Sequence, residues 1–584
     1  MGGKSVAGGR STGMFFSRFV HTALGSVAVA GLCTSAGALA QAPQQPSPSV
    51  SPGLIQERVA PRAPAPPPKP ELPEIKPQPA PEAVPDALKA IKITLKDIRI
   101  EAATPLPPAQ ARQVADVTNG YIGREITGHD VFDLARTLTV TYRNLGYILS
   151  QVVVPPQSLA EGTLRLRVIE GYIANVRIEG DETVRSTLAA LGEKIKASRP
   201  LEARTLERYL LIANDLPGVR VRAVLSPSPT AGAADLTLIA EVRKAEGYAS
   251  LDNYGSKYLG PGQLALSLAG NQLLGVNDQL RFVGVTTGSN REMNFGQLSY
   301  SQTVGTEGLK LAAIVSQTST RPGDVLQQFD IRGEATSATA LAVYPLLRTR
   351  NDSVFGRVAS DHRDVNSDIL GTRVIQDRIR ALRLGATWLA LDRIDGYNTL
   401  DVEYSAGLGG TQQDDPLRSR ADADGNYRKV MFDYERVQPI GAGYSLTVGL
   451  GGQWTDDALL TSEQYALGGR RFGRAYDPAE LVGDKALAFR MEPAYQGFGG
   501  GTLRSYQPYA FYDVGKVWNI VNGTTSPQYS ASLASAGFGV RLAFDRNITA
   551  TLEAAWPLTK AVASYQTDGQ GYDVRIHGSL VVRF

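Results

Sequence analysis

The C-terminal half of the chain alternates apolar and polar residues over several segments. In the clearest of these, Leu400–Leu408, every even-numbered residue is apolar, while Asp401 and Glu403 stand between them. The same period of two recurs in Tyr444–Leu450 and Ile548–Ala554. Such a period gives a β-strand with one apolar and one polar face. Strands of about nine to eleven residues with the apolar face outward cross a bilayer as a closed barrel. The pattern therefore predicts a membrane β-barrel.

A soluble β-sandwich would also alternate, but three features favour the membrane barrel. No clear helical segment interrupts the region from Tyr248 to the C-terminus, which is long for one sandwich. The polar faces carry charged residues such as Arg541 and Glu553. The last strand, Ile576–Phe584, ends on an aromatic residue, as in the C-terminal signal of bacterial outer-membrane proteins. We therefore expect residues 246–584 to form a transmembrane antiparallel β-barrel of about 16 strands.

The N-terminus has the features of a secretory signal over residues 1–40. Basic residues precede the apolar stretch Val20–Leu32, and Ala38–Ala40 fits a cleavage site of small residues. The chain of 584 residues is too long for one ordinary domain. Its net charge of +3 produces no field that would favour nucleic acid, so no nucleic-acid partner is expected.

The composition also limits the chemistry that the protein can perform. The single cysteine, Cys33, lies in the predicted signal, and Leu32 is not the small residue that precedes a lipidated cysteine. A chain cleaved after Ala40 has no disulfide and no Cys/His zinc site. The four histidines lack ligand spacing, and neither a Ser/His/Asp group nor a phosphate-binding loop is recognisable. We therefore expect no enzyme, no cofactor and no metal.

Between the signal and the barrel, a proline-rich segment precedes two small α+β units. Residues 41–87 are dense in proline, which fixes φ and lacks an N–H, so we expect an extended linker. Within it Leu54–Val59 could form a short helix. Residues 88–170 (the first unit) and 171–245 (the second unit) each follow the order β-α-α-β-β.

The predicted elements of the two units follow from their hydrophobic periods and helix caps. Those of the first unit are Ile91–Ile100, Ala109–Tyr121, a helix capped by Thr127, Ile148–Val154 and Thr163–Glu170. Those of the second unit are Ile173–Glu179, Thr183–Ala197, Leu201–Asn214, Val219–Leu225 and Asp235–Arg243. Each unit leaves a sheet edge that a partner strand could join. The candidate partner-binding residues on these edges are Ile148, Val152, Val219 and Val221.

Three stretches of the barrel region resemble motifs of a known family. Leu251–Gly255, with Gly260 and Asn271–Gly275, resembles the first barrel hairpin. Leu467–Pro478 resembles the sixth loop with its Val-Arg-Gly-Tyr/Phe motif, and Phe511–Gly515 resembles a Phe-x-Asp-x-Gly strand. Together with the signal, the linker and two POTRA-like units, they make the chain similar to the outer-membrane transporters of two-partner secretion. These form the haemolysin/filamentous-haemagglutinin secretion and activation family, in one superfamily with the barrel-assembly machine.

The resemblance implies that the sixth loop folds back into the lumen, where Arg474 pairs with Asp513 on the barrel wall. A guanidinium can hold a carboxylate through two parallel hydrogen bonds, and a confined lumen screens the pair less than bulk water does. The sequence departs from the motif at Gly473, where valine is frequent, and at Ala475, where glycine is usual. The residues that the resemblance assigns to this loop–barrel lock are Arg474, Tyr476, Asp513 and Gly515.

The resemblance also implies a function in the Gram-negative outer membrane, with the POTRA units in the periplasm. Such a channel binds an unfolded secreted partner through its POTRA units and translocates it to the surface without nucleotide hydrolysis. The partner would be a large adhesin, a cytolysin or a contact toxin. Outer-membrane lipid and, during biogenesis, the barrel-assembly machine would be further partners. Inward residues such as Asp401, Glu403 and Glu553 would keep the channel wet. The alternatives are a barrel-assembly or insertion factor, which usually carries more POTRA units, and a passive porin, which needs none.

Overall fold

The computed structural model describes residues 48–59, 74–75, 92–159, 161–288, 292–521, 530–559 and 574–584. Every described residue belongs to one compact unit, Ser47–Phe584. The predicted signal, with Cys33 and the cleavage site at Ala38–Ala40, lies outside the described residues, as does most of the predicted linker. In the described part of the chain, no helix is long and apolar enough to span a membrane.

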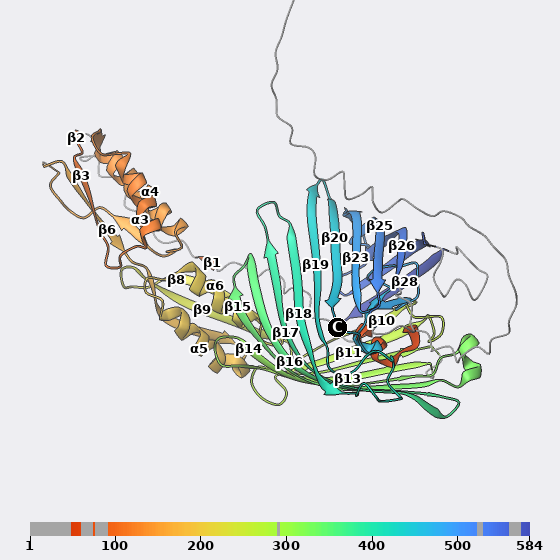
Figure 1. The fold of residues 1–584 in the computed structure, drawn as a ribbon. Coiled ribbons are helices and arrows are strands. Elements are labelled where there is room, and N and C mark those ends of the chain that lie inside the picture. Colours follow the sequence, from red (N-terminus) through yellow and green to blue (C-terminus); the bar gives the residue numbers. More distant parts are fainter. Residues whose placement is uncertain are drawn as a thin grey trace, which may run out of the picture. The chain divides into compact units, whose positions relative to one another are not determined.

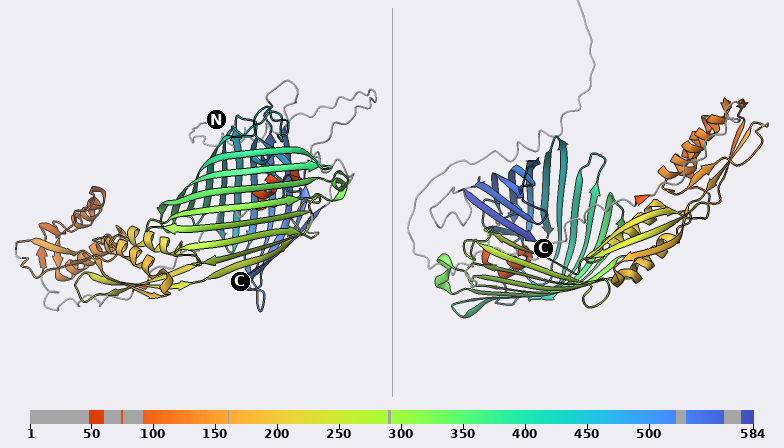
Figure 2. Two further views of the ribbon diagram at one scale, coloured as in Figure 1. Left: turned by 90° about the horizontal axis from the view of Figure 1, so that it is seen from below. Right: turned by 180° about the vertical axis from the view of Figure 1, so that it is seen from behind.

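The predicted barrel is confirmed: among the described residues, 16 antiparallel strands close into one sheet (Figure 1). The strands run obliquely side by side (Figure 2), as closure of a sheet into a barrel requires. They are β10 (Ala245–Asp252), β11 (Gln263–Asn271), β12 (Asp278–Thr287), β13 (Met293–Val304), β14 (Leu309–Thr320), β15 (Arg332–Arg348), β16 (Asp352–Ile369), β17 (Thr372–Leu391), β18 (Tyr397–Gly410), β19 (Arg428–Gly441), β20 (Tyr444–Thr455), β23 (Lys485–Tyr495), β25 (Ser505–Trp518), β26 (Ser530–Ala543), β27 (Ile548–Pro557) and β28 (Arg575–Arg583). The short β24 (Gly497–Phe498) continues β23 along β25.

The alternation in β18 places its side chains as predicted. The side chains of Val402 and Tyr404 are 36% and 40% exposed on the outer face. Asp401 and Glu403 point to the other side, where both accept hydrogen bonds from Arg357 of β16. The period of two therefore gave the correct register, because a shift of one residue would exchange the two faces.

The barrel closes between its first and last strands. β28 pairs with β10 from Tyr248↔Arg583 to Asp252↔Ser579. The terminal Phe584 extends this pairing, since its backbone N–H donates to the carbonyl oxygen of Gly247. The predicted terminal strand thus forms one side of the closing seam.

The first unit contains two helices and two small sheets. Its elements are β2 (Lys92–Thr94), β3 (Asp97–Glu101), α3 (Pro108–Asn119), β4 (Glu125–Thr127), α4 (Gly128–Asn144), β5 (Gln151–Val153) and β6 (Thr163–Ile169). The cap at Thr127 is confirmed: its side chain accepts from the Asp130 N–H, and the Asp130 carboxylate accepts in return from the Thr127 N–H. The prediction of one strand over Ile91–Ile100 is wrong. Leu95 turns into the core, with 1% of its surface exposed, so that β2 pairs with β4 and β3 pairs with β6.

The second unit packs two helices on one sheet. Its elements are β7 (Tyr172–Gly180), η2 (Glu182–Val184), α5 (Arg185–Lys196), α6 (Ala203–Asn214), β8 (Val219–Pro227) and β9 (Ala233–Val242). The sheet has the order β1-β8-β9-β7, in which β1 (Glu74–Ile75) comes from the predicted linker. β1 runs parallel to β8, opposite Val224 and Leu225. A segment of the chain itself therefore pairs with the β8 edge.

The N-terminal part of the linker lies inside the barrel. η1 (Pro48–Val50) leads into α1 (Pro52–Val59), which confirms and extends the short predicted helix. Figure 2 shows this red segment within the ring of strands. The buried side chain of Ile55 packs in one cluster with Val283 and Phe295 of the wall. Gln56 donates from Nε2 to the hydroxyl oxygen of Ser337 at 2.7 Å. The helix thus fills part of the lumen.

Candidate functional site in the barrel lumen

The sixth loop, residues 456–484 between β20 and β23, folds into the lumen as a hairpin. Its strands β21 (Tyr465–Leu467) and β22 (Leu481–Gly483) pair antiparallel. The residues between them turn back against the wall, where the buried side chains of Phe472 and Tyr476 pack in one cluster with Phe511. Apolar packing thus holds the tip of the loop, and it places the side chain of Arg474 beside the wall.

The backbone at Gly473 and Ala475 explains how this loop tolerates its departures from the family motif. Gly473 adopts a φ of 84°, a left-handed conformation that side chains disfavour. A Cβ atom at this position would lie 2.5 Å from Cδ1 of Leu533 on β26, so valine does not fit here. Ala475 does not adopt a positive φ. Of the two motif positions that differ, Gly473 therefore adopts the left-handed conformation, and alanine at position 475 does not have to adopt it.

Arg474 contacts Asp513 of β25 through a fork of two hydrogen bonds. Its Nε and Nη2 atoms lie 3.0 Å from Oδ2 and Oδ1 of Asp513, respectively. The backbone N–H of Arg474 donates to the same carboxylate at 3.3 Å. Only 4% of the Arg474 surface and none of the Asp513 surface is exposed. The structure thus brings together the two residues that the motifs pair, in a place where water screens their charges little.

Two further carboxylates complete the site around Arg474. Its Nη1 atom lies 2.8 Å from Oε2 of Glu492 on β23 and 3.1 Å from Oε2 of Glu553 on β27. The guanidinium carbon lies 3.6 Å from the ring centroid of Phe511, a cation–π contact. We did not predict Glu492. Glu492 and Glu553 both occupy inward positions of their strands, but the sequence does not show which inward residues meet across the sheet.

Asp401, Glu403 and Glu553, which we expected to keep the channel wet, also form ion pairs. Glu553 is buried against Arg474 and also accepts a hydrogen bond from the Tyr509 hydroxyl at 2.8 Å. Asp401 and Glu403 are paired with Arg357. These carboxylates are inward-facing as expected, but they hold cations of the wall and the loop rather than water alone.

The other two residues of the predicted lock also contact the loop–wall junction. The Tyr476 hydroxyl lies 2.9 Å from the carbonyl oxygen of Ala534 and accepts from the Thr559 N–H at 3.0 Å. At Gly515, a Cβ atom would lie 2.7 Å from Cδ1 of Leu467 in β21. Gly515 therefore lets the loop approach the backbone of the wall, and Tyr476 ties the loop to β26 and to the end of β27.

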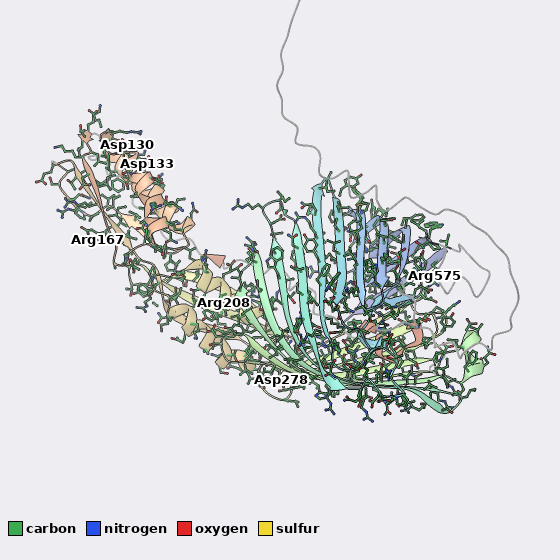
Figure 3. All side chains as sticks on the ribbon, viewed as in Figure 1. Asp130, Asp133, Arg167, Arg208, Asp278 and Arg575 are labelled. Carbon is green, nitrogen blue, oxygen red and sulfur yellow. The ribbon has the colours of Figure 1, made fainter. Side chains whose placement is uncertain are left out.

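The last barrel strand supplies two contacts that the sequence did not indicate. His577 donates from Nε2 to the carbonyl oxygen of Arg474 at 2.9 Å. Arg575, labelled in Figure 3, pairs with the buried carboxylate of Asp477 at 2.7 Å. Both contacts reach the loop from β28. The loop is thus held by the strand that also closes the barrel against β10.

The predicted partner-binding edges are already hydrogen-bonded where the candidate residues lie. The Val152 N–H donates to the hydroxyl oxygen of Thr139 on α4 at 2.9 Å. The Val221 N–H donates to Oδ1 of Asn214 on α6 at 2.9 Å. Each unit thus caps its candidate edge with a side chain of the preceding helix.

The remaining two candidates have buried or partly buried side chains. Ile148 lies before β5, which begins at Gln151, and packs against the core of the second unit. Val219 is part of that core. The part of the β8 edge that pairs with another strand lies farther along, at Val224 and Leu225, where β1 is bound.

The second unit is fastened to the barrel by ion pairs. Asp215 accepts two hydrogen bonds of 2.8 Å from Arg348 at the end of β15. Glu307, in the turn between β13 and β14, accepts hydrogen bonds from Tyr209 at 3.0 Å and from Arg208, which is labelled in Figure 3. Partial burial by itself would raise the pKa of Glu307, but hydrogen bonds from Lys194, Tyr209 and Arg208 outweigh it and lower that pKa. Glu307 is therefore charged at neutral pH.

No group of three or more His, Cys, Asp or Glu side chains within the described residues could hold a metal ion. The barrel interior contains a cavity of about 580 Å³ between α1, the sixth loop and the wall. Its lining includes Ile55 of α1, Arg470 and Arg474 of the loop, and Glu492 and Glu553 of the wall. The geometry is that of a channel filled by two segments of its own chain.

Comparison with known proteins identifies matching families for most of the chain. The model of the haemolysin secretion/activation protein family ShlB/FhaC/HecB matches residues 236–542. The model of the ShlB-type POTRA domain matches residues 93–171, the first unit. The structure of CdiB from Escherichia coli superimposes with a TM-score of 0.68 at 20% identity, covering 86% of this chain and 93% of that one. This similarity shows a common fold.

Relatives in sequence are distant and are named as transporters. The heme/hemopexin transporter protein HuxB of Haemophilus influenzae (strain 86-028NP) is 22% identical over 365 residues, which cover 61% of this chain and 64% of HuxB. The outer membrane transporter CdiB of Dickeya dadantii (strain 3937) is 25% identical over 492 residues, covering 82% of this chain and 85% of CdiB. The chain thus spans less than two thirds of the length of HuxB.

Proposed function

The chain belongs to the haemolysin secretion/activation protein family ShlB/FhaC/HecB, and from this membership we propose that it passes a secreted partner protein across the outer membrane. The barrel lies in the outer membrane of a Gram-negative cell, and its POTRA units lie in the periplasm. The partner arrives unfolded, enters the lumen and folds at the surface, which makes its passage one-way. Neither nucleotide nor cofactor takes part.

The observation that carries this proposal is how the lumen is filled. α1 and the sixth loop occupy it, and neither of them is part of the barrel sheet itself. Their contacts are polar as well as apolar, with Gln56 bound to Ser337 and Arg474 bound to three carboxylates. A channel closed in this way can open for a large chain and otherwise remain a permeability barrier.

We propose that the partner binds by adding a strand to the second unit. Backbone pairing suits an unfolded partner because it needs no preformed surface on it. The edges at Val152 and Val221 are capped by Thr139 and Asn214, which protects them from unspecific pairing. The β8 edge at Val224 and Leu225 accepts a strand, since β1 pairs there. In this proposal the partner strand displaces β1.

The class of partner follows from the relatives only in outline. HuxB is named a heme/hemopexin transporter protein, and CdiB an outer membrane transporter. For this chain we propose one large secreted protein, of the adhesin, cytolysin or contact-toxin kind, and we propose that the transporter performs no chemistry on it. The family match supports a transporter rather than a barrel-insertion factor.

The proposal is tested by comparing the proteins outside the cell in the parent strain and in a strain that lacks this chain. Loss of one large extracellular protein, restored by the wild-type chain, is the expected result. A general loss of outer-membrane barrels would instead indicate an insertion factor. An unchanged set of extracellular proteins with altered permeability to small solutes would indicate a porin, and either result would overturn the proposal.

A further inference from the structure

Besides the contacts of Arg474 and Asp477, the sixth loop has a buried charged contact with other strands of the barrel, formed by Glu463. Glu463 ends the short helix η4 (Thr461–Glu463) near the base of the loop, and only 1% of its surface is exposed. Its Oε1 atom lies 2.8 Å from Nη2 of Arg383 on β17, and its Oε2 atom lies 2.9 Å from Nζ of Lys429 on β19. Whereas Arg474 contacts β23, β25 and β27, Glu463 contacts the strands around β17.

The contacts of Glu463 belong to a continuous network of buried ion pairs. Arg383 also pairs with Asp361 at 3.1 Å and with Glu403 at 3.6 Å. Glu403 in turn pairs with Arg357, which also holds Asp401. The cations of this network are Arg357, Arg363, Arg383 and Lys429, and its anions are Asp361, Asp401, Glu403 and Glu463. The network is therefore balanced, and loss of Glu463 would leave an uncompensated positive charge.

The helix η4 also packs against α1. A Cβ atom at Gly53 of α1 would lie 2.6 Å from Cβ of Ser462 and 3.1 Å from Cγ2 of Val365 on β16. The backbone of α1 at Gly53 thus packs directly against the side chain of Ser462 in η4, and no side chain would fit between them. Arg363 donates from Nη1 to the carbonyl oxygen of Ser462 at 3.3 Å, which fixes η4 from the wall side. The position of α1 therefore depends on where η4 is held.

We infer that Glu463 is a positioning residue that anchors η4 to the wall and thereby holds α1 in the lumen. This inference rests on the proposed channel function, because α1 must leave for a partner to pass. The Glu463 anchor then holds the base of the loop and the Arg474 site holds its tip, and α1 packs against the base, at η4. Freeing Glu463 removes the support that η4 gives to α1 even while Arg474 stays bound to Asp513. Wall contacts such as those of Ile55 and Gln56 then hold α1.

The nature of the contact suits such a release. Apolar side chains of the same volume often stabilise a structure as well as a buried ion pair does. Stability alone therefore does not explain why charged residues occupy this position. The pair is strong while the lumen around it is filled by protein and weak once water surrounds it, because water screens the charges. An entering chain that admits water at η4 would therefore weaken the ion pairs of Glu463 and, with them, the contact between η4 and α1.

The inference is tested with a thiol reporter in η1, the short helix directly before α1. Ser49 in η1 is buried, with 2% of its surface exposed, and Cys33 lies in the predicted signal, so Ser49→Cys supplies the single thiol of the chain from residue 41 onward. The rate at which a maleimide labels this thiol in the purified, full-length protein measures how often α1 leaves the lumen. The readout needs no partner, so it remains informative if the proposed function is wrong.

Adding Glu463→Gln to this protein is expected to raise the labelling rate about tenfold or more, in the range of couplings between sites in proteins. The matched control is Asp456→Asn, which neutralises a carboxylate of the same loop that is 86% exposed and pairs with Lys485. This control is expected to label at the parent rate. Equal rates for Glu463→Gln and the parent would overturn the inference.

A double variant separates the anchor from the charge balance. Glu463→Gln with Lys429→Gln restores the balance but not the tether, so labelling should stay fast. A return to the parent rate would show that net charge, not the anchor, seats α1. If Glu463→Gln does not assemble a heat-modifiable barrel, Lys429→Gln alone tests the contact from the wall, and it must also raise the labelling rate.

Discussion

Arg474 in the sixth loop and Asp513 in β25 meet side-on, with two guanidinium nitrogens each 3.0 Å from one carboxylate oxygen. Both residues are almost completely buried, and Glu492 and Glu553 contact the Nη1 atom of the same guanidinium. One cation thus contacts three carboxylates from three strands, of which Glu492 also pairs with Arg541. The loop therefore cannot leave the wall without exposing these carboxylates to one another or to water.

The first prediction is that Arg474→Ala and Arg474→Lys both abolish or strongly reduce secretion. Removal of one partner from a buried ion pair costs about 3–5 kcal/mol, and a lysine cannot offer the planar fork that three acceptors require. The strands remain intact, so the barrel should still assemble and show heat modifiability in gels. Arg470→Ala is the control, because Arg470 is an exposed residue of the same loop. Secretion at the wild-type rate by Arg474→Ala would contradict the prediction.

A second prediction concerns the close approach of the loop to β25. Gly515→Ala places a methyl group 2.7 Å from Cδ1 of Leu467, and overpacking of this kind costs about 1–3 kcal/mol. We expect lower secretion and a lower temperature of barrel unfolding. Leu467→Ala in the same protein should restore part of both, since it makes room for the methyl group. Gly500→Ala, where no atom lies within 4 Å of the new methyl, should change neither measurement.

The parts of this protein that could be predicted from sequence are those set by local patterns. The faces of β18 follow from a period of two, and the start of α4 follows from Thr127 and Asp130, which satisfy each other's backbone within one turn. Arg474 and Asp513 were predictable because each stands in a motif. In each case the residues that decide the structure are close in sequence, or a known motif indicates that two distant residues meet.

The parts that could not be predicted depend on contacts between distant segments. Glu492 looks like any inward carboxylate until the folded loop brings Arg474 to it. Leu95 interrupts a regular strand pattern because the core of the first unit takes up its side chain. The capping of Val221 by Asn214 requires the distance between a helix end and a strand. None of these contacts leaves a local signal in the sequence.

A third prediction distinguishes the two faces of β18. Val402→Lys places a charge on the outer face, which costs about 2–4 kcal/mol in the middle of the bilayer, so the yield of assembled barrel should fall. Glu403→Gln changes the adjacent inward residue and leaves Arg357 and Arg383 with less negative charge. It should assemble normally and shift the ion selectivity of the channel toward anions in planar bilayers. Normal assembly of Val402→Lys together with failure of Glu403→Gln would mean that the two faces are exchanged.

The last prediction concerns capture of the partner at the β8 edge. The N–H of Val221 points away from β9 to Asn214, and in an antiparallel pair this direction repeats at every second residue. The N–H of Leu225 therefore points toward β1 and is available once β1 leaves. Leu225→Pro removes this donor and should weaken binding of the N-terminal part of the partner to the purified transporter. Proline is tolerated on the open side of an edge strand, so the second unit should stay folded.

The matched change on the competing strand should have the opposite effect. Proline at both Glu74 and Ile75 removes the N–H groups with which β1 can pair, while β8 stays intact. If the partner displaces β1, this variant binds the partner more tightly than the wild type does, and Leu225→Pro cancels the gain when the changes are combined. Tighter binding that persists in the combined protein would place the capture site elsewhere. Unchanged binding in all three variants would mean that recognition lies in the lumen, where the barrel alone, without the POTRA units, should still export the partner.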